Sequence, residues 1–473
     1  MTWETVVGLE VHVQLRTRTK MFCGCRTTFG DPPNTNVCPT CLGLPGALPA
    51  PNAEAIRLAT RGALALGCEV HATSVFARKN YFYPDLPKGY QISQFDRPLA
   101  TGGRVAFDSP ERGRIEVGIT RLHVEEDAGK LIHDRFPGKT AVDLNRAGTP
   151  LAEIVSEPDI RSPAEARAYL VTLRQILVYA GVSDCSMELG SLRVDANISL
   201  RRPGDSMLGT KTEVKNLNSF ANVERALEAE RERQIGLLER GDRVAQVTLL
   251  FNAATGQVRA LRSKEESHDY RYFPDPDLPP LVLAPEWIAD QRDGLPELPE
   301  ARRARLEVTY GLPAYDARVL TSEVGLAEYY ESVVGAGVEP KTAANWVMGD
   351  VMTTFNETGA FPVEAGRLAG LVTLVREGVV SHQAAKRVYV ELAQRPGDEP
   401  KAVAERLGLV QVSDQGALTG WVEEVLAAHP AEVARYRGGE TKLMGFFVGQ
   451  VMKRSQGKAD PKGVQPVLQA KLG

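Results

Sequence analysis

Apolar and polar residues alternate in short runs from about residue 4 to residue 285 of the chain. Side chains that alternate with a period of two point to opposite faces of an extended backbone, so each run predicts a half-buried β-strand. The clearest runs are TVVGLEVHVQL, GRIEVGITRLHVEE, PLAEIVSE, SLRVDANISL and KTEVKNLN. We therefore expect this part of the chain to form a sheet whose strands are mostly antiparallel.

Three longer segments with helical character interrupt these strands, at residues 52–67, 162–181 and 221–241. The first begins with Asn52, a residue type that caps helices well, and ends at a glycine. The second has a serine cap, a proline at the first helical position and a glutamate three residues after the cap. These are the components of a capping box, so they predict a helix start.

The pattern changes in the last third of the chain. Seven prolines fall within the 26 residues from Pro274 to Pro299, which predicts an extended linker between domains. Helical patterns follow, and a second break occurs at residues 394–401. We expect an α+β fold with a mostly antiparallel-sheet domain over residues 1–294, an all-α domain over 295–400 and a small helical tail domain over 401–473.

Length and composition fit a folded protein of several domains. The chain has 473 residues, of which 43% are hydrophobic and 25% are charged, and its formal net charge is −4; these values argue against bulk disorder. The start of the chain lacks a basic segment followed by an apolar one, and the sequence has no apolar run of about 18 residues. We expect no secretion signal, no membrane span and a cytoplasmic location.

The final segment differs from the rest of the chain in charge. Residues 435–473 contain eight Lys or Arg and two Asp or Glu, which gives a net charge of +6 on a chain that is acidic overall. A local basic surface of this kind suits contact with nucleic-acid phosphates. The alternative is an ordinary solvated helical face.

Four of the six cysteines lie within nineteen residues, in FCGCRTTFGDPPNTNVCPTCLG. Cys23 and Cys25 form one pair and Cys38 and Cys41 form another, so the two pairs could meet around one ion. Four thiolates fill the tetrahedral shell of zinc and leave no position for a substrate, which is typical of a structural site. The alternatives are an iron–sulfur cluster, whose usual spacings differ, and four reduced cysteines without metal. We expect structural Zn²⁺ that holds a proline-rich loop in shape.

Acidic residues gather on the polar faces or at the ends of three predicted strands. They are Glu10 with His12 in VVGLEVHVQL, Glu125 and Glu126 in RLHVEEDAGK, and Glu153 in PLAEIVSE. For any single strand, such a face is more often the solvated side of an antiparallel sheet. Here, however, the acids stand beside glycine, asparagine and apolar residues. Carboxylates with one imidazole suit Mg²⁺, so we expect a magnesium site.

Four further residues are candidates for contact with a nucleotide. Lys79 and Lys88 lie in ARKNYFYPDLPKGYQISQ and could face phosphates, unless they are ordinary surface lysines. Asp195 and Glu213 lie on the polar faces of LRVDANISL and TKTEVKNLN. The usual nucleotide motifs are absent: in PGKT, His133 stands where a phosphate-binding loop has its first glycine. No G-x-S-x-G elbow occurs either, so the chain does not look like a hydrolase with its own nucleophile.

Seven segments in order resemble the B subunit of the glutamyl/aspartyl-tRNA amidotransferase. They are GLEVHVQL, NYFYPDLPKGYQISQ, GITRLHVEEDAGK, DLNRAGTPLAEIVSEPDIRSP, GSLRVDANIS, EVKNLNSF and DYRYFPDPDLPP. The resemblance covers essentially the whole chain, including GFFVGQVMKRSQGKADPKGVQPVLQAKL, which is similar to the YqeY-like tail of that family. It implies an N-terminal cradle with the kinase and transamidase site, and helical and tail domains that bind tRNA.

The resemblance also implies a two-step reaction. ATP and Mg²⁺ serve to phosphorylate the side-chain carboxylate of glutamate on tRNA(Gln) or of aspartate on tRNA(Asn). Ammonia, released from glutamine by an amidase-type A subunit, then displaces the phosphate, and a small C subunit completes the heterotrimer. A non-discriminating aminoacyl-tRNA synthetase is a further candidate partner.

Position by position, the resemblance assigns roles to residues already singled out. Glu10, His12, Glu125, Glu126 and Glu153 match the metal-site motifs of the family, and the four cysteines match a zinc knuckle that many but not all members carry. The sequence leaves open which mischarged tRNA is the substrate, how many Mg²⁺ bind, and which of Glu125 and Glu126 is a direct ligand. The competing hypothesis is a non-catalytic, zinc-containing RNA-binding protein whose acids are only solvated strand faces.

Overall fold

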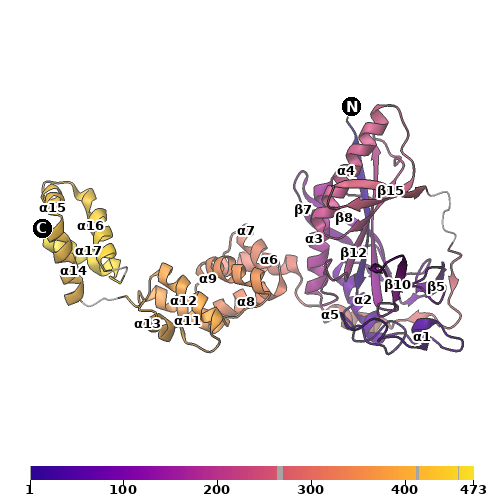
Figure 1. The fold of residues 1–473 in the computed structure, drawn as a ribbon, viewed down its shortest axis with the longest axis horizontal. Coiled ribbons are helices and arrows are strands. Elements are labelled where there is room, and N and C mark those ends of the chain that lie inside the picture. Colours follow the sequence, from indigo (N-terminus) through magenta and orange to yellow (C-terminus); the bar gives the residue numbers. More distant parts are fainter. Residues whose placement is uncertain (1, 264–269, 412–414, 456–457) are drawn as a thin grey trace. The chain divides into compact units, whose positions relative to one another are not determined.

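The computed structural model describes residues 2–263, 270–411, 415–455 and 458–473. The chain divides into two compact units, Met1–Pro299 and Glu300–Gly473. The first combines strands with helices and the second is helical (Figure 1), so the expected α+β fold is confirmed. Two quoted segments extend outside the described residues: Asp269 opens DYRYFPDPDLPP, and Gln456 and Gly457 belong to the closing segment.

A ten-stranded sheet forms the centre of the first unit. Its strands are β1 (Glu4–Gln14), β2 (Glu69–Val70), β6 (Ala100–Thr101), β7 (Arg104–Ser109), β8 (Gly113–Glu126), β11 (Pro150–Ser156), β12 (Leu192–Arg201), β13 (Thr212–Leu217), β14 (Val247–Asn252) and β15 (Gln257–Ser263). Their order is β15-β14-β13-β12-β1-β11-β8-β6-β2, and β7 pairs with β8. All pairs are antiparallel except β13 with β14. The five quoted strand segments are therefore confirmed as strands of a mostly antiparallel sheet.

The register of these strands sets polar residues in rows. His12 lies opposite Glu153 in the pairing of β1 with β11, and Glu153 lies opposite His123 in the pairing of β11 with β8. Glu10 lies opposite Asp195 of β12. The alternate residues of β1 are valines and leucines that are buried on the opposite face of the sheet, as the alternation predicted.

Three small sheets complete the strands of the first unit. They pair β9 (Lys130–Phe136) with β10 (Lys139–Asp143), β4 (Ala77–Asn80) with β5 (Tyr90–Ser93) and β16 (Phe273–Pro274), and β3 (Thr73–Ser74) with β17 (Leu281–Val282). The expectation of an extended linker from Pro274 to Pro299 is wrong, because β16 and β17 pair within the first unit. Proline is compatible with short edge strands, where it removes no internal hydrogen bond.

Within residues 2–263 and 270–298, the first unit has five helices: α1 (Pro39–Leu42), α2 (Ala53–Ala65), α3 (Pro163–Tyr179), α4 (Phe220–Glu239) and α5 (Pro285–Asp293). The three helices expected from the sequence are confirmed as α2, α3 and α4. Each begins at a side-chain cap, formed by Asn52, Ser162 and Ser219. Helices α3 and α4 pack against each other and against β7 and β12 (Figure 1). They cover the apolar face of the sheet and leave its polar face for the site.

The second unit consists of helices. They are α6 (Pro299–Tyr310), α7 (Ala314–Leu320), α8 (Val324–Gly335), α9 (Pro340–Trp346), the π-helical η1 (Val347–Val351), α10 (Met352–Thr358), α11 (Ala365–Arg376), α12 (His382–Gln394), α13 (Pro400–Arg406), α14 (Gln415–Ala428), α15 (Pro430–Arg437), the 3₁₀-helical η2 (Thr441–Leu443), α16 (Met444–Arg454) and α17 (Pro461–Leu472). One hydrophobic cluster runs from Leu306 to Ala404 and another from Leu418 to Leu472.

The domain boundaries at residues 294 and 400 stay predictions. Within the described ranges, no helix is long and apolar enough to cross a membrane.

A buried carboxylate holds the start of α3. Glu165 has no exposed surface, and it accepts hydrogen bonds from Arg112 Nε at 2.6 Å, Ser109 Oγ at 2.7 Å and the Arg161 amide at 2.8 Å. Burial by itself would raise the pKa of Glu165, but Arg112 and the other donors lower it below the usual value of 4.5. Such a carboxylate stabilises the fold above its unfolded pKa and loses this contribution as the pH falls through its folded pKa.

We predict that Glu165→Gln lowers the free energy of unfolding of the first unit by about 2 kcal/mol at neutral pH, because buried donors lose their charged acceptor. The difference from the wild type should shrink as the pH falls below 4.5. Unfolding in urea, monitored by hydrogen exchange of the amides in the large sheet, measures this free energy. The control Glu116→Gln removes one partner of an exposed ion pair with Arg104 and should cost less than about 1 kcal/mol. Equal losses in the two variants would contradict the prediction.

Candidate active site

A cavity of about 730 Å³ lies on the polar face of the large sheet. Strands β1, β8, β11, β12 and β13 contribute one part of its lining. Strands β4 and β5, together with residues 270 and 272, contribute the other part. Segments that are far apart in the sequence therefore meet at this cavity.

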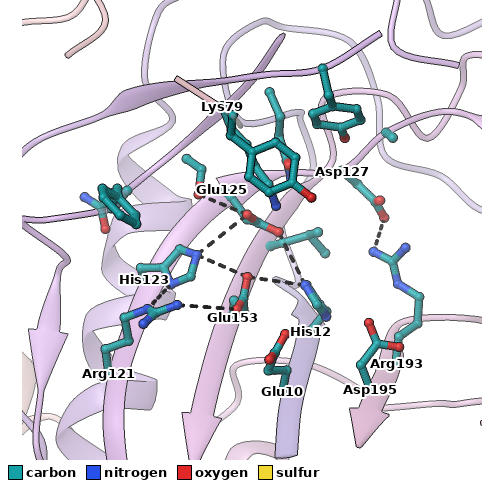
Figure 2. A pocket seen from close by; sticks show the side chains of 18 of the residues that line it. Glu10, His12, Lys79, Arg121, His123, Glu125, Asp127, Glu153, Arg193 and Asp195 are labelled. Atoms are coloured by element: carbon teal, nitrogen blue, oxygen red, sulfur yellow. Dashed lines mark hydrogen bonds and ion pairs between the residues drawn. The ribbon is translucent and has the colours of Figure 1, made fainter. Parts of the chain in front are cut away.

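Two imidazoles and two carboxylates meet inside the cavity (Figure 2). His12 Nε2 lies 3.4 Å from Glu153 Oε2 and 3.7 Å from Glu125 Oε1. His123 Nε2 lies 3.2 Å from the same oxygen of Glu153 and 3.6 Å from Glu125 Oε2. The side chains of His123 and Glu125 are only 4% and 3% exposed. We call these four residues the central cluster.

The charges of the central cluster shift the pKa of each member. Burial by itself would lower the pKa of His123, but the carboxylates of Glu153 and Glu125 raise it to about 9. The same carboxylates raise the pKa of His12 against the effect of burial. Burial would raise the pKa of Glu125 and of Glu153, and the two imidazoles lower both instead. The arrangement therefore favours the charged form of all four groups.

Three members of the central cluster are placed to hold a cation. One ligand atom each of His12, Glu125 and Glu153 lies within 4.8 Å of the others. Two carboxylates and an imidazole form a donor set that suits a hard divalent ion. A bound cation would compete with the protons of the imidazoles for the same carboxylate oxygens. Glu10 lines the same cavity but is not one of these three.

A second group of acids lies beside the central cluster. Lys215 Nζ is 2.5 Å from Asp195 Oδ2 and 3.0 Å from Glu213 Oε1, and all three side chains line the cavity. Burial is the main cause that raises the pKa of Glu10, and the charges of Glu153, Asp195 and Glu213 raise it further. Glu10 is therefore crowded by acids that Lys215 compensates only in part.

Lys79 of β4 enters the cavity beside an aromatic surface. Its Nζ lies 4.8 Å from the centre of the Tyr270 ring. Burial by itself would lower the pKa of Lys79, but the carboxylates of the central cluster raise it. Tyr272 stacks on Phe95 with 4.2 Å between ring centres, and both rings line the cavity. The lysine ammonium group can pair with a phosphate of a ligand, and the aromatic rings beside it can stack on a flat ring of the same ligand.

Glu126 and Lys88 are not among the residues that line this cavity. They form an ion pair with each other, and Glu126 also accepts a hydrogen bond from the Ile92 amide at 2.9 Å. Alternation along β8 sends Glu125 and Glu126 to opposite faces, so Glu125 is the one that reaches the central cluster. The expected roles of Glu126 as a metal ligand and Lys88 as a cofactor contact stay predictions, and this placement does not support them.

The cavity residues that were not assigned to the site from the sequence include His123, Asp127 and Arg193. His123 stands two residues before Glu125, which is the spacing of the acid and histidine in β1, so a local signal was present. Asp127 is 3% exposed and accepts a hydrogen bond from Arg193 at 2.8 Å (Figure 2). The two residues of this pair are separated by 66 positions, and no local pattern predicts their contact.

The four clustered cysteines form a second candidate metal centre, which we call the cysteine cluster. All four Sγ atoms lie within 4.8 Å of one another. Cys41 Sγ is 3.6 Å from Cys23 Sγ, 3.8 Å from Cys38 Sγ and 3.9 Å from Cys25 Sγ. Sulfur atoms bound to one tetrahedral zinc ion at about 2.3 Å are about 3.8 Å apart. The cysteine cluster therefore has the donors and the dimensions of a four-thiolate site.

Comparison with known proteins relates the chain to one family. Residues 5–289 match the GatB/GatE catalytic domain, and residues 328–472 match the GatB domain. Similar proteins of Geobacter sulfurreducens and Geotalea daltonii are each 53% identical over 100% of both chains. One of Moorella thermoacetica is 52% identical, also over 100% of both chains. All three carry the name of the B subunit of aspartyl/glutamyl-tRNA(Asn/Gln) amidotransferase. Because these matches extend over the whole length, the chain belongs to the GatB/GatE family of amidotransferase subunits.

Proposed function

We propose that this chain is the B subunit of a heterotrimeric, tRNA-dependent amidotransferase and carries its kinase and transamidase site. Its substrates would be Glu-tRNA(Gln), Asp-tRNA(Asn) or both. The observation that carries the proposal is the set of half-buried His12 and buried Glu125 and Glu153, in one cavity with Lys79. This arrangement combines ligands for a divalent cation with a positive side chain for phosphate, which are the requirements of phosphoryl transfer.

The residues of the cavity fit Mg²⁺ and ATP. His12, Glu125 and Glu153 would hold the metal ion, with Glu10 as a further candidate ligand. When bound, the ion neutralises phosphate charge and orients the nucleotide. Of the four residues expected to contact the nucleotide, Lys79, Asp195 and Glu213 line the cavity and Lys88 does not.

Positive side chains are needed here because both reactants are anionic. The acids of the cavity repel a substrate carboxylate and a triphosphate, so both require fixed cations nearby. Lys79 and Arg193 provide such cations, and Asp127 holds Arg193 in place. Tyr270 and Tyr272 add flat apolar surface that excludes water from the reacting groups.

The proposed reaction has two balanced steps. A side-chain carboxylate oxygen of the mischarged amino acid attacks the γ-phosphorus, the bond between this phosphorus and the ADP oxygen breaks, and ADP leaves. Lys79 stabilises the negative charge of the transferred phosphoryl group electrostatically, and no covalent enzyme intermediate forms. Ammonia then attacks the acyl carbon, phosphate leaves, and the nitrogen loses a proton to give the amide.

Other surfaces and chains complete this function. We assign glutamine hydrolysis to an A subunit of the amidase type, and a C subunit completes the assembly in the cytoplasm. The tail segment 435–473 would contact tRNA phosphates. Four exposed lysines support this role, since they have no ion-pair partner among the described residues: Lys442, Lys453, Lys458 and Lys462. Affinity that depends on such contacts falls steeply with salt.

Structural Zn²⁺ in the cysteine cluster is a further part of the proposal. Its support is the fit of the four sulfur atoms to a tetrahedral site. Such a site has no open position for substrate, so its expected contribution is to hold the polar loop between the two cysteine pairs.

The alternative of a non-catalytic RNA-binding protein is disfavoured by burial. That hypothesis requires the acidic side chains to lie on solvated faces of the strands. As whole residues, Glu125 is 2% exposed, His123 is 3% exposed and Glu153 is 8% exposed. Charged groups withdrawn from water in this way are costly, and they cluster at functional sites.

We predict that Glu153→Gln lowers the rate of ATP-dependent amide formation by on the order of 100-fold or more, because a neutral amide is a poor ligand and leaves two imidazoles uncompensated. The assay reconstitutes the chain with A and C subunits, glutamine, ATP and each mischarged tRNA, and tRNA binding should be retained. The control Glu157→Gln lies outside the cavity, where it bonds Thr120, and should keep its activity. An unchanged rate in Glu153→Gln would show that the central cluster takes no part in the reaction. Absence of amide formation by the wild type with either tRNA would refute the proposed function.

Replacement of a zinc ligand should affect stability before it affects chemistry. We predict that Cys38→Ser lowers bound zinc below one per chain and lowers the melting temperature by about 5 °C, with kcat of the folded fraction nearly unchanged. Metal analysis and thermal unfolding measure the two effects. Cys68→Ser replaces a buried cysteine outside the cysteine cluster and should leave the zinc content unchanged. Full zinc binding by Cys38→Ser would contradict the assignment of this ligand.

A further inference from the structure

Lys20 is a buried lysine whose ammonium group contacts the cysteine cluster. It has no exposed surface, and its Nζ donates to the Asn36 carbonyl at 2.7 Å, the Leu144 carbonyl at 3.2 Å and Cys41 Sγ at 3.4 Å. A buried ammonium ion is strongly unfavourable unless a negative charge compensates it. Four thiolates around a divalent ion keep two net negative charges and would compensate Lys20.

The Leu144 carbonyl belongs to the turn between β10 and β11, residues 144–149. The loop between the two cysteine pairs holds the same turn. Asn34 Oδ1 accepts from the Leu144 amide at 2.8 Å, and Asn145 Oδ1 accepts from the Asn36 amide at 2.9 Å. Lys20 and this loop therefore fix the turn on the side that faces the cysteine cluster.

The other side of the turn holds Asp127 at the cavity. The Gly148 amide donates to the Asp127 carbonyl, and the Asp127 amide donates to the Thr149 carbonyl, each at 2.8 Å. Arg146 Nε lies 3.6 Å from the Asp127 carboxylate. That carboxylate in turn accepts from Arg193, which lines the cavity (Figure 2). The position of Arg193 thus depends on the 144–149 turn.

A second lysine connects the cysteine cluster to the end of β8. Helix α1 contains Cys41 and ends at Leu42, and the residue that caps it, Gly43, has a positive φ of 63°, which favours glycine. A Cβ atom at Gly43 would lie 2.6 Å from Lys88 Cγ and 3.0 Å from Lys88 Cα, so the helix end packs directly on this lysine. The Lys88 ammonium pairs with Glu126, which is the neighbour of Glu125 in the central cluster.

We propose that Lys20 and Lys88 are positioning residues that couple metal occupancy of the cysteine cluster to the geometry of the cavity. This inference rests on the proposed function, since it concerns the same cavity. Lys20 acts through the 144–149 turn on Asp127 and Arg193, and Lys88 acts through Glu126 on the end of β8. Loss of the metal removes the ion that ties Cys41 to the other three sulfur atoms, so Lys20 loses a fixed acceptor, the turn is released and Arg193 loses its fixed position. The cysteine cluster thereby controls substrate binding in addition to holding its loop.

Hydrogen exchange of the full chain tests the Lys20 connection without an activity assay. Lys20→Met keeps the length of the side chain and removes its charge. We expect the Asp127 and Gly148 amides of this variant to exchange about tenfold faster, while amides at the centre of β12 keep their rates. Lys130→Met removes an exposed lysine close to Asp127 and is the matched control, which should change neither amide. Unchanged exchange at both amides in the folded Lys20→Met variant overturns the proposal.

A second measurement applies if Lys20→Met does not fold. A chelator is used to remove zinc briefly from the wild-type chain, with metal analysis to follow its release. The Asp127 and Gly148 amides should then exchange faster before the centre of β12 is affected. Release of zinc without any change at these two amides, or with equal acceleration throughout the sheet, overturns the coupling.

Kinetics of the assembled enzyme separate positioning from stability. In Lys20→Met we expect KM for the mischarged tRNA to rise about tenfold with kcat nearly unchanged, because the loosened Arg193 weakens substrate binding. A purely structural role would reduce the amount of active enzyme, and so the apparent kcat, at an unchanged KM; that result would contradict the proposal. Failure of the proposed function is distinguishable, because the wild type itself would then form no amide.

Discussion

The burial of negative charge on one face of the large sheet is the constraint on which the rest of the structure depends. Two carboxylates withdrawn from water are unfavourable unless positive groups lie in contact with them. The register of three antiparallel strands meets this need, since it sets His12, Glu153 and His123 in one row across β1, β11 and β8. A shift of one residue in any of these strands would turn its member of the row to the apolar face. The same register therefore specifies both the core and the site.

A sequence pattern reports only on residues close together in the chain, and this explains which features of the fold and the site could be predicted. Alternation within one strand is a local signal, and it placed His12 on the polar face opposite the buried valines. Spacing within one short segment likewise brought the cysteines together. Pairs such as Asp127 with Arg193, or Glu126 with Lys88, join distant segments, and no periodicity reports them. The linker prediction for the prolines before residue 299 was wrong for a related reason. Proline is common both in linkers and in short edge strands, and only the partner strand, which is distant in the sequence, distinguishes the two.

The two candidate metal centres differ in the chemistry that their donors allow. Four sulfur atoms around a tetrahedral ion form a closed, soft shell that has no room for a reactant. Two carboxylates and one imidazole form an incomplete, hard shell, whose remaining positions would be filled by water or phosphate oxygens. Buried Lys20 contacts Cys41 of the cysteine cluster, and half-buried Lys88 packs against Gly43 at the end of helix α1. Of the two donor sets, only the carboxylate and imidazole set leaves positions at which reactants could exchange.

The central place of β1 in the sheet also affects how the chain is made. Among the described strands β1 is synthesised first, yet its neighbours are β11 and β12, which end at Ser156 and Arg201. At about 5–20 residues per second, roughly 10–40 s pass before both neighbours exist. During that interval the nascent polypeptide carries the four valines and one leucine of β1 without a strand to pair with. Until translation has passed residue 201, β1 therefore remains an unpaired apolar strand, the kind of segment that chaperones protect from aggregation.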